Sequence, residues 1–235
     1  MTLTITPVSG VGTIDDASDL VATFLSAWDA MGGELCHHDL VAVTSKVVAK
    51  AEGRVVAFDG TEEDKMRLIE AESRRILRRR DQLRITETFH GFVCANAGID
   101  LSNTLPGTAV LLPLDPDRSA RRMRAEFRRL RDVDVAVIVT DTFGRVWRNG
   151  VTDVAIGSAG VVPVLDLRGT VDGNGRVLEA TEVAIVDEIA GAINLVLGKA
   201  ANTPFAVARG LREEYFGEGS VKEHVVRSSN DDLFR

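Results

Sequence analysis

The feature that most constrains the fold is the apolar run at residues 133–140, VDVAVIVT. It is short and rich in β-branched residues, and this composition indicates a strand rather than a helix. Because apolar side chains occupy both alternating sets of positions, both faces of this strand must be covered by other elements. Comparable runs predict further strands at residues 3–8, 40–49, 92–95, 108–114 and 205–208. The chain must therefore build a sheet with a layer on each side.

Four segments have the apolar periodicity and the end signals of helices. They are residues 16–31, 61–80, 118–131 and 181–197. In the second of them, Thr61 is the capping residue, acids at 62–64 fill the first turn and the arginines at 78–80 fill the last. This order of charges suits the helix dipole.

Strands mixed with amphipathic helices predict an α+β fold, with mixed α/β as the alternative. The sequence DGNG at 172–175 predicts a hairpin turn. No linker rich in Pro, Gly or Ser divides the chain, so a discontinuous arrangement of two domains stays open.

Charge and composition argue against several classes of protein. The 235 residues carry 28 basic and 35 acidic side chains, a net charge of −7, so no nucleic-acid partner is expected. Cys36 and Cys94 are too few for a disulfide framework and lack zinc-site spacing, so inert thiols are expected. No apolar run reaches the roughly 20 residues of a membrane span, and no signal-peptide pattern is present. We therefore expect no membrane partner and a cytoplasmic location.

Two arginine-rich segments stand out in this acidic chain: RRILRRR at 74–80 and RSARRMRAEFRRLRD at 118–132. Apolar residues fall between the arginines at helical spacing, so solvated helix faces are the favoured interpretation. A positive rim that attracts a polyanionic substrate is the alternative.

Three acidic residues follow apolar runs or lie among glycines: Asp100, Asp141 and Glu218. Mg²⁺ and Mn²⁺ are bound by several oxygen ligands, usually carboxylates together with phosphate and water. Carboxylates that converge at strand ends would make such a site, and the hydroxyl of Thr142 follows Asp141 directly. Each acid taken alone is more typical of a cap or a turn.

Glycine clusters and a pair of lysines indicate an anion site. In SGVG at 9–12 and GEGS at 217–220, backbone N–H groups can approach an anion closely. Ser45 stands beside Lys46, with Lys50 four residues further on, and these cations can contact phosphate oxygens. Lysines whose stems merely cover a sheet are the alternative. The Walker loop, G-x-G-x-x-G, H-x-x-x-H and G-x-S-x-G are all missing from the sequence.

Seven blocks, in this order, resemble the coenzyme F420-0:L-glutamate ligase family: PVSGVG, VTSKVVAKAEG, CANAGIDLSN, LLPLDPD, VTDTFGRVWRNGVTDVAIGSAG, VDEIAGAINLVLG and GEGS. The likeness covers residues 4–227 and is greatest to the actinobacterial form, in which the ligase is the N-terminal half of a bifunctional protein. It implies a ligase domain over residues 1–227 and a flexible tail at 228–235. The flavin reductase domain of longer relatives is then missing from this chain, and no bound flavin is expected.

The resemblance also implies an activity and a fold. Members use GTP and Mg²⁺ or Mn²⁺ to join L-glutamate to the deazaflavin precursor, coenzyme F420-0, through an amide bond. They release GDP and phosphate and add further glutamates through γ-linkages; monovalent K⁺ is a further candidate ion. The implied fold is an unusual α+β arrangement with a mixed sheet, two intertwined subdomains and an intertwined homodimer.

Site residues are implied by the same match. The positions that match metal ligands are Asp100, Asp141, Thr142 and Glu218. Those that match GTP contacts are Ser9, Gly10, Val11, Gly12, Ser45, Lys46, Lys50, Asn103, Phe216, Gly217, Gly219, Ser220, Val221, Lys222 and Glu223. As catalytic residues we predict Asp141 with Arg145 and Arg148, whose guanidinium groups can hold a carboxylate or phosphate by paired hydrogen bonds. Surface pairing is the alternative for the two arginines.

Two other functions fit the same residues. A metal-dependent GTP hydrolase or kinase would turn over GTP without glutamate or the deazaflavin precursor. A non-catalytic nucleotide-binding module would bind GTP and keep this property in an Asp141→Asn variant.

Overall fold

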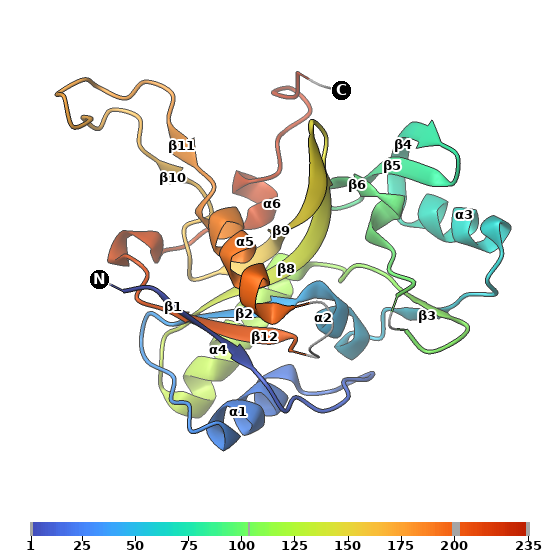
Figure 1. Ribbon diagram of the computed structural model, residues 1–235, viewed down its shortest axis with the longest axis horizontal. Coiled ribbons are helices and arrows are strands. Elements are labelled where there is room, and N and C mark those ends of the chain that lie inside the picture. Colours follow the sequence, from blue (N-terminus) through green and yellow to red (C-terminus); the bar gives the residue numbers. More distant parts are fainter. Residues whose placement is uncertain (1, 103, 199–202, 234–235) are drawn as a thin grey trace.

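The computed structural model describes residues 2–102, 104–198 and 203–233, and its centre is a five-stranded mixed sheet (Figure 1). In spatial order the strands are β1 (Thr4–Val8), β12 (Phe205–Arg209), β2 (Leu40–Thr44), β8 (Ala136–Arg145) and β9 (Arg148–Ala159). β2 and β8 pair in parallel, and the other pairs are antiparallel. The α+β prediction is confirmed.

Helices cover both faces of this sheet. α1 (Leu20–Ala30) and α4 (Pro116–Arg131) pack together on one face, and α5 (Ile185–Leu197) covers the other (Figure 1). Phe24 of α1 meets the rings of Phe127 and Phe205 edge to face, with centroids 5.2 and 5.5 Å apart. All three rings are fully buried. Cover on both faces explains why β2 and β8 are apolar on both sides.

Three smaller sheets and several short helices surround the centre. The sheets are β4 (Ser73–Arg80) with β5 (Leu83–Thr88) and β6 (Val93–Ala95); β3 (Val55–Ala57) with β7 (Thr108–Val110); and β10 (Leu165–Asp166) with β11 (Glu182–Val183). The helices are α2 (Ser45–Ala51), α3 (Glu62–Ala71), α6 (Val221–His224) and the 3₁₀ turns η1 (Asn96–Gly98) and η2 (Glu213–Tyr215). No helix within the described ranges has the length and apolarity needed to cross a membrane.

The strand predicted at residues 40–49 is correct only in its first half. β2 ends at Thr44, and α2 begins at the next residue. Ser45, Val48 and Ala49 are buried together, at the spacing of one helix face. The β-branched valines favoured a strand, but the burial of this face outweighs their local preference.

The helix predicted at residues 61–80 is also correct only in its first half. Thr61 does cap α3, since its hydroxyl oxygen accepts the N–H of Asp64 at 3.1 Å. The helix ends at Ala71, and the arginine-rich segment forms the edge strand β4 instead. The solvated helix face expected at 74–80 is therefore wrong, because pairing with β5 decides the conformation there.

β8 is longer than predicted and continues into a strand that the sequence analysis missed. The apolar run ends at Thr140, but β8 extends to Arg145 and pairs with β9 through a projecting hairpin (Figure 1). The register shifts between Val139 and Thr140, which marks a β-bulge. Asp141 thus follows an apolar run but lies inside a strand, directly after a bulge. Bulges commonly redirect side chains beside active sites.

The remaining predicted helices and strands are present, with changed ends. The turn at 172–175 closes a hairpin in which the Asp172 N–H donates to the Arg176 carbonyl at 2.8 Å. The helix predicted at 181–197 begins only at Ile185, because residues before it form β11.

Candidate functional site

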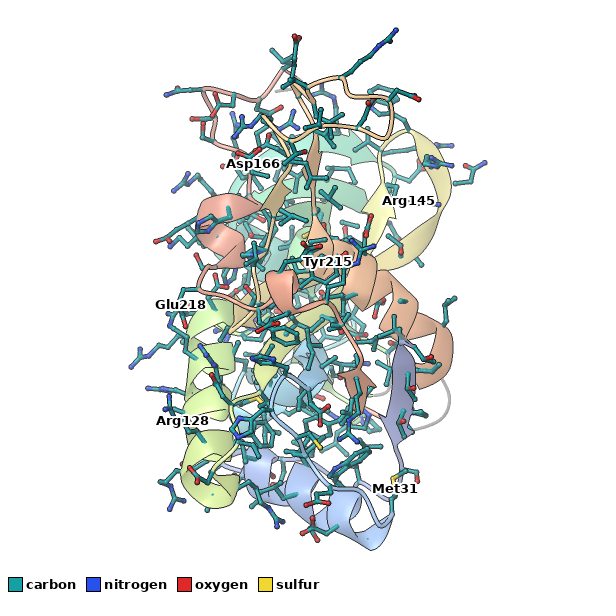
Figure 2. All side chains as sticks on the ribbon, turned by 90° about the vertical axis from the view of Figure 1, so that its left-hand side faces the viewer. Met31, Arg128, Arg145, Asp166, Tyr215 and Glu218 are labelled. Carbon is teal, nitrogen blue, oxygen red and sulfur yellow. The ribbon has the colours of Figure 1, made fainter. Side chains whose placement is uncertain are left out.

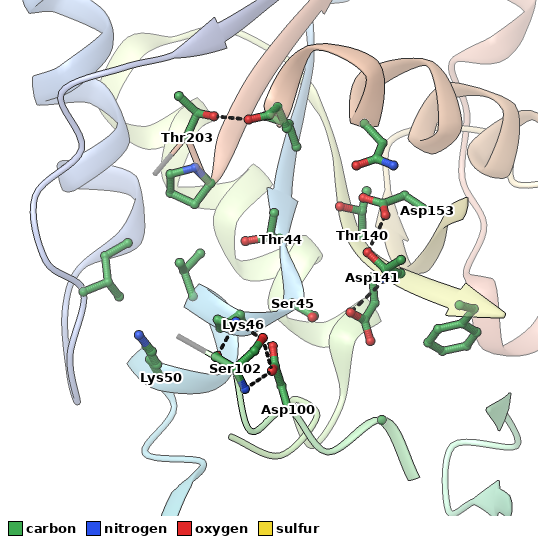
Figure 3. Close-up of a pocket in the computed structure, with 18 of the residues that line it drawn as sticks. Thr44, Ser45, Lys46, Lys50, Asp100, Ser102, Thr140, Asp141, Asp153 and Thr203 are labelled. Carbon is green, nitrogen blue, oxygen red and sulfur yellow. Dashed lines mark hydrogen bonds and ion pairs between the residues drawn. The ribbon is translucent and has the colours of Figure 1, made fainter. Parts of the chain in front are cut away.

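A cavity of about 740 Å³ opens where β2 ends beside β8 (Figure 3). Thr44 and Thr140 pair in register in these parallel strands, and both line the cavity. Other walls come from residues 11–14, from α2 and from the segment around η1. A cavity of this size can hold a ligand as large as a nucleotide.

Asp141 and Thr142 enter the cavity from β8, just past the bulge. The Asp141 Oδ1 accepts the Thr142 backbone N–H at 2.9 Å. The Thr142 hydroxyl donates to Oδ1 of Asp153 at 2.6 Å, across the β8–β9 hairpin (Figure 3). Both lone pairs of the Thr142 hydroxyl therefore stay available to a cation.

Asp153 was missed by the sequence analysis. It lies opposite Thr142 in the hairpin register, lines the cavity and is 5% exposed. The signal was an acid in the otherwise apolar stretch VTDVAIG, since a carboxylate in such a strand needs a partner. Recognising it required β9, which was not predicted.

The environment of Asp141 disfavours its charged form. Burial raises the pKa of Asp141 from 3.8 to about 7, and the negative charges of Asp153 and Asp100 act in the same direction. Hydrogen bonds from the Thr142 N–H and the Ser45 hydroxyl oppose the rise. A cation beside these carboxylates would relieve the repulsion between them.

Asp100 also lines the cavity and forms an ion pair with Lys46. The Lys46 Nζ lies 2.5 Å from Asp100 Oδ2 and donates to the Ser102 carbonyl at 2.8 Å. Burial alone would raise the pKa of Asp100, but hydrogen bonds from Lys46 and Ser102 hold it below its ordinary value. Lys50 also lines the cavity and forms no ion pair with any described residue.

The cavity gathers many of the residues predicted from sequence. It is lined by Val11, Gly12, Ser45, Lys46, Lys50, Asp100, Asp141 and Thr142. Ser9 and Gly10 come directly before Val11 in the chain but do not line the cavity. The Ser9 N–H donates instead to the Met31 sulfur at 3.3 Å. Asn103 lies outside the described residues.

Arg145 and Arg148 are not brought to the cavity. They lie opposite each other in the strand register at the end of the β8–β9 hairpin, and both side chains are exposed. Figure 2 shows Arg145 on this projecting hairpin, and its Nη2 donates to the Asn149 carbonyl at 2.8 Å.

The segment 216–223 is not brought to the cavity either. Its Glu218 lies exposed beside α4 (Figure 2). Glu218 forms an ion pair with Arg124 of α4 at 2.7 Å. The buried carboxylate of Asp117 accepts the N–H groups of Val221 and Lys222 at 2.9 and 3.1 Å and anchors the segment beside α4. Within one copy of the chain, Glu218 is therefore separated from Asp100 and Asp141.

The oxygen ligands in the cavity suit a hard divalent cation that takes only some of its ligands from the protein. Among the residues described, no three His, Cys, Asp or Glu side chains gather into a complete metal site. Asp100 and Asp141 supply two carboxylates, and Thr142 adds a hydroxyl. Mg²⁺ is typically held by one or two carboxylates, with phosphate oxygens and water completing its shell.

Comparison with known proteins connects this chain to one family. The family described as F420-0:Gamma-glutamyl ligase matches residues 10–210. The coenzyme F420:L-glutamate ligase of Methanopyrus kandleri is 41% identical, covering 94% of this chain and 92% of its own length. Its namesakes in Methanothermobacter thermautotrophicus and Archaeoglobus fulgidus are 34% and 37% identical over all of this chain, covering 100% and 97% of their own lengths.

Proposed function

The chain belongs to the F420-0:gamma-glutamyl ligase family, and from this premise we propose that it joins L-glutamate to coenzyme F420-0 through an amide bond, using GTP and a divalent cation. Further glutamates are added through γ-linkages. The observation that carries the proposal is the cavity in which Asp141, Thr142 and the Lys46–Asp100 pair face one another.

The reaction needs an activated carboxylate. Condensation of a carboxylate with an ammonium group is unfavourable in water, so we propose that the acceptor carboxylate first attacks the γ-phosphorus of GTP. GDP leaves, and the acyl phosphate that forms is then attacked by the glutamate amine, which displaces phosphate. Lys46 and Lys50, with the backbone of Val11 and Gly12, can position the phosphates of GTP for this attack.

The acids of the cavity are suited to hold Mg²⁺ or Mn²⁺. Asp100, Asp141 and the Thr142 hydroxyl would supply its protein ligands. When bound, the cation neutralises charge between the two anionic reactants and on the transferring phosphoryl group. Asp153 orients the Thr142 hydroxyl, and Ser45 contacts Asp141 from α2.

We further propose that the chain works as a homodimer in which a second copy completes the site. Glu218 and the segment 216–223 are then supplied by the partner to the cavity that holds Asp141. Val146, Trp147 and Val151 support this arrangement, because they leave large apolar side chains exposed on the projecting β8–β9 hairpin.

A mass-spectrometric assay tests the activity. With coenzyme F420-0, GTP, Mn²⁺ and L-glutamate present, we expect a product heavier by one glutamyl unit, and none when any single component is omitted. The matched variants are Asp141→Asn, which should abolish ligation, and Arg121→Ala on the exposed face of α4, which should leave it unchanged. GTP turnover that needs neither glutamate nor the precursor would instead identify a hydrolase or kinase.

A further inference from the structure

The β4–β5 hairpin carries a group of arginines that the reaction described above leaves unused. We call Arg78, Arg79, Arg80 and Arg84 the basic hairpin. We propose that it binds the γ-linked glutamate tail of the growing product, through the free carboxylates of glutamates already added. This inference rests on the proposed function and names the part of the molecule that holds the tail.

The two ends of the hairpin differ in how their charges are balanced. Near the start of β4, Arg74 and Arg75 lie 3.5 and 2.7 Å from the buried carboxylate of Glu87. Near the turn, Arg79 lies directly opposite Arg84. Like charges in directly opposed positions destabilise a strand pair. An anion between them would remove this cost.

The arginines of the basic hairpin have spare hydrogen-bonding capacity. Arg78, Arg79 and Arg80 are exposed and form no ion pair with any residue that the structure describes. Arg84 turns back to the carbonyls of Asp81 and Leu83, at 2.5 and 3.1 Å. Its Nε is buried and has no acceptor within the described ranges. Arg78 uses one N–H for the Leu77 carbonyl at 2.7 Å, so accessible guanidinium donors remain on Arg78, Arg79 and Arg80, the exposed arginines of β4.

The basic hairpin starts next to the cavity. Ile85 pairs with Ala95, which lines the cavity wall. Arg84 is the adjacent residue, and its backbone N–H donates to the Asn96 side chain at 2.9 Å. Figure 1 shows β4 and β5 projecting beyond β6 at the side of the molecule. A chain that leaves the cavity along this wall would therefore pass Arg84 first and the exposed arginines of β4 next.

The chemistry of the product matches this surface. Each γ-linked glutamate leaves one α-carboxylate free, so the tail presents carboxylates at regular intervals. Guanidinium groups bind carboxylates by paired hydrogen bonds. The chain as a whole carries a net charge of −7, so an anionic tail needs a local basic surface to bind. The growing end must lie at the reaction centre, so the earlier glutamates must extend outward.

A binding experiment tests the inference independently of ligation. The probe is a synthetic peptide of four γ-linked L-glutamates, titrated into the full chain by calorimetry. We expect Arg79→Ala/Arg80→Ala to weaken binding about tenfold or more. Arg121→Ala/Arg122→Ala removes the same charge from the exposed face of α4 and should leave the affinity unchanged. Equal affinities of both double variants and the wild type would overturn the inference. The arginines would then serve only to prevent other chains from pairing with the exposed edge strand β4.

A kinetic experiment separates this inference from the proposed function. In the Arg79→Ala/Arg80→Ala variant, KM should rise for an acceptor that already carries two glutamates and stay unchanged for coenzyme F420-0. If the wild type ligates glutamate and the variant treats both acceptors alike, the inference is wrong and the proposed function stands. If the wild type ligates nothing, the proposed function is wrong, and the peptide titration alone decides whether the hairpin binds γ-glutamyl chains.

Discussion

Asp141 lines the cavity together with Asp100 and Asp153, and the negative charges of both disfavour its ionised form. Burial has the largest effect and raises the pKa of Asp141 to about 7. Such an arrangement costs stability when every carboxylate is charged and no cation is present. It is therefore suited to a site that is complete only with its ligand.

The first prediction concerns the pH dependence of stability without a cation. The folded-state pKa of about 7 lies above the ordinary value of 3.8, so the stabilising contribution of protonated Asp141 is full below pH 3.8 and is lost as the pH rises to about 7. Across this window, the free energy of unfolding of the wild type should fall relative to that of Asp141→Asn. Urea denaturation in EDTA measures both. If the free energies of unfolding of both proteins change with pH in parallel, burial does not raise the pKa of Asp141.

The second prediction concerns the hydrogen bond between Thr142 and Asp153. Loss of a residue that orients a metal ligand typically weakens metal binding about 10- to 100-fold. We expect Asp153→Ala to weaken Mn²⁺ binding by that amount, and Asp153→Asn to weaken it less, because asparagine keeps an oxygen that accepts the Thr142 hydroxyl. Electron paramagnetic resonance of free Mn²⁺ measures the affinity. If the two variants bind Mn²⁺ equally, the hydrogen bond does not orient the hydroxyl.

Among the elements, the β8–β9 hairpin does most to position the site. Its bulge precedes Asp141, its register places Asp153 opposite Thr142, and its inner end packs on α4. Gly157 allows that packing, because an added Cβ would lie 2.3 Å from the backbone carbon of Pro116. The hairpin was not predicted, since the glycines of RNGVTDVAIGSAG resemble a loop when read locally.

The third prediction tests this packing. Gly157→Ala should lower the free energy of unfolding by about 1–3 kcal/mol, because helix α4 must move to admit the methyl group. Gly144→Ala is the matched control in the same hairpin, since its added Cβ meets no atom within 4 Å. Urea denaturation should separate the two variants. Equal stabilities would mean that α4 moves freely relative to β9.

For the whole molecule, the separation of Glu218 from Asp141 makes the proposed homodimer testable. Mixed dimers of Asp141→Asn and Glu218→Gln contain one site with both changes and one site with neither, provided that each site combines two subunits. Co-expression of the two inactive variants should therefore restore about a quarter of the wild-type activity. If each site used residues of one subunit, both sites of the mixed dimer would be damaged and no activity would return.

The sequence by itself determined the covered sheet, the main helices α1, α4 and α5 and the family, because these depend on apolar periodicity and ordered blocks that are local in the chain. It also named Asp100, Asp141 and Thr142 and the lysines of α2, which the fold brings to one cavity. Only the tertiary structure decided that residues 74–80 form a strand, that Asp153 holds Thr142 and that Glu218 lies apart. The physical reason is that strand pairing and convergence at a site depend on contacts between distant segments, and these contacts override local preference.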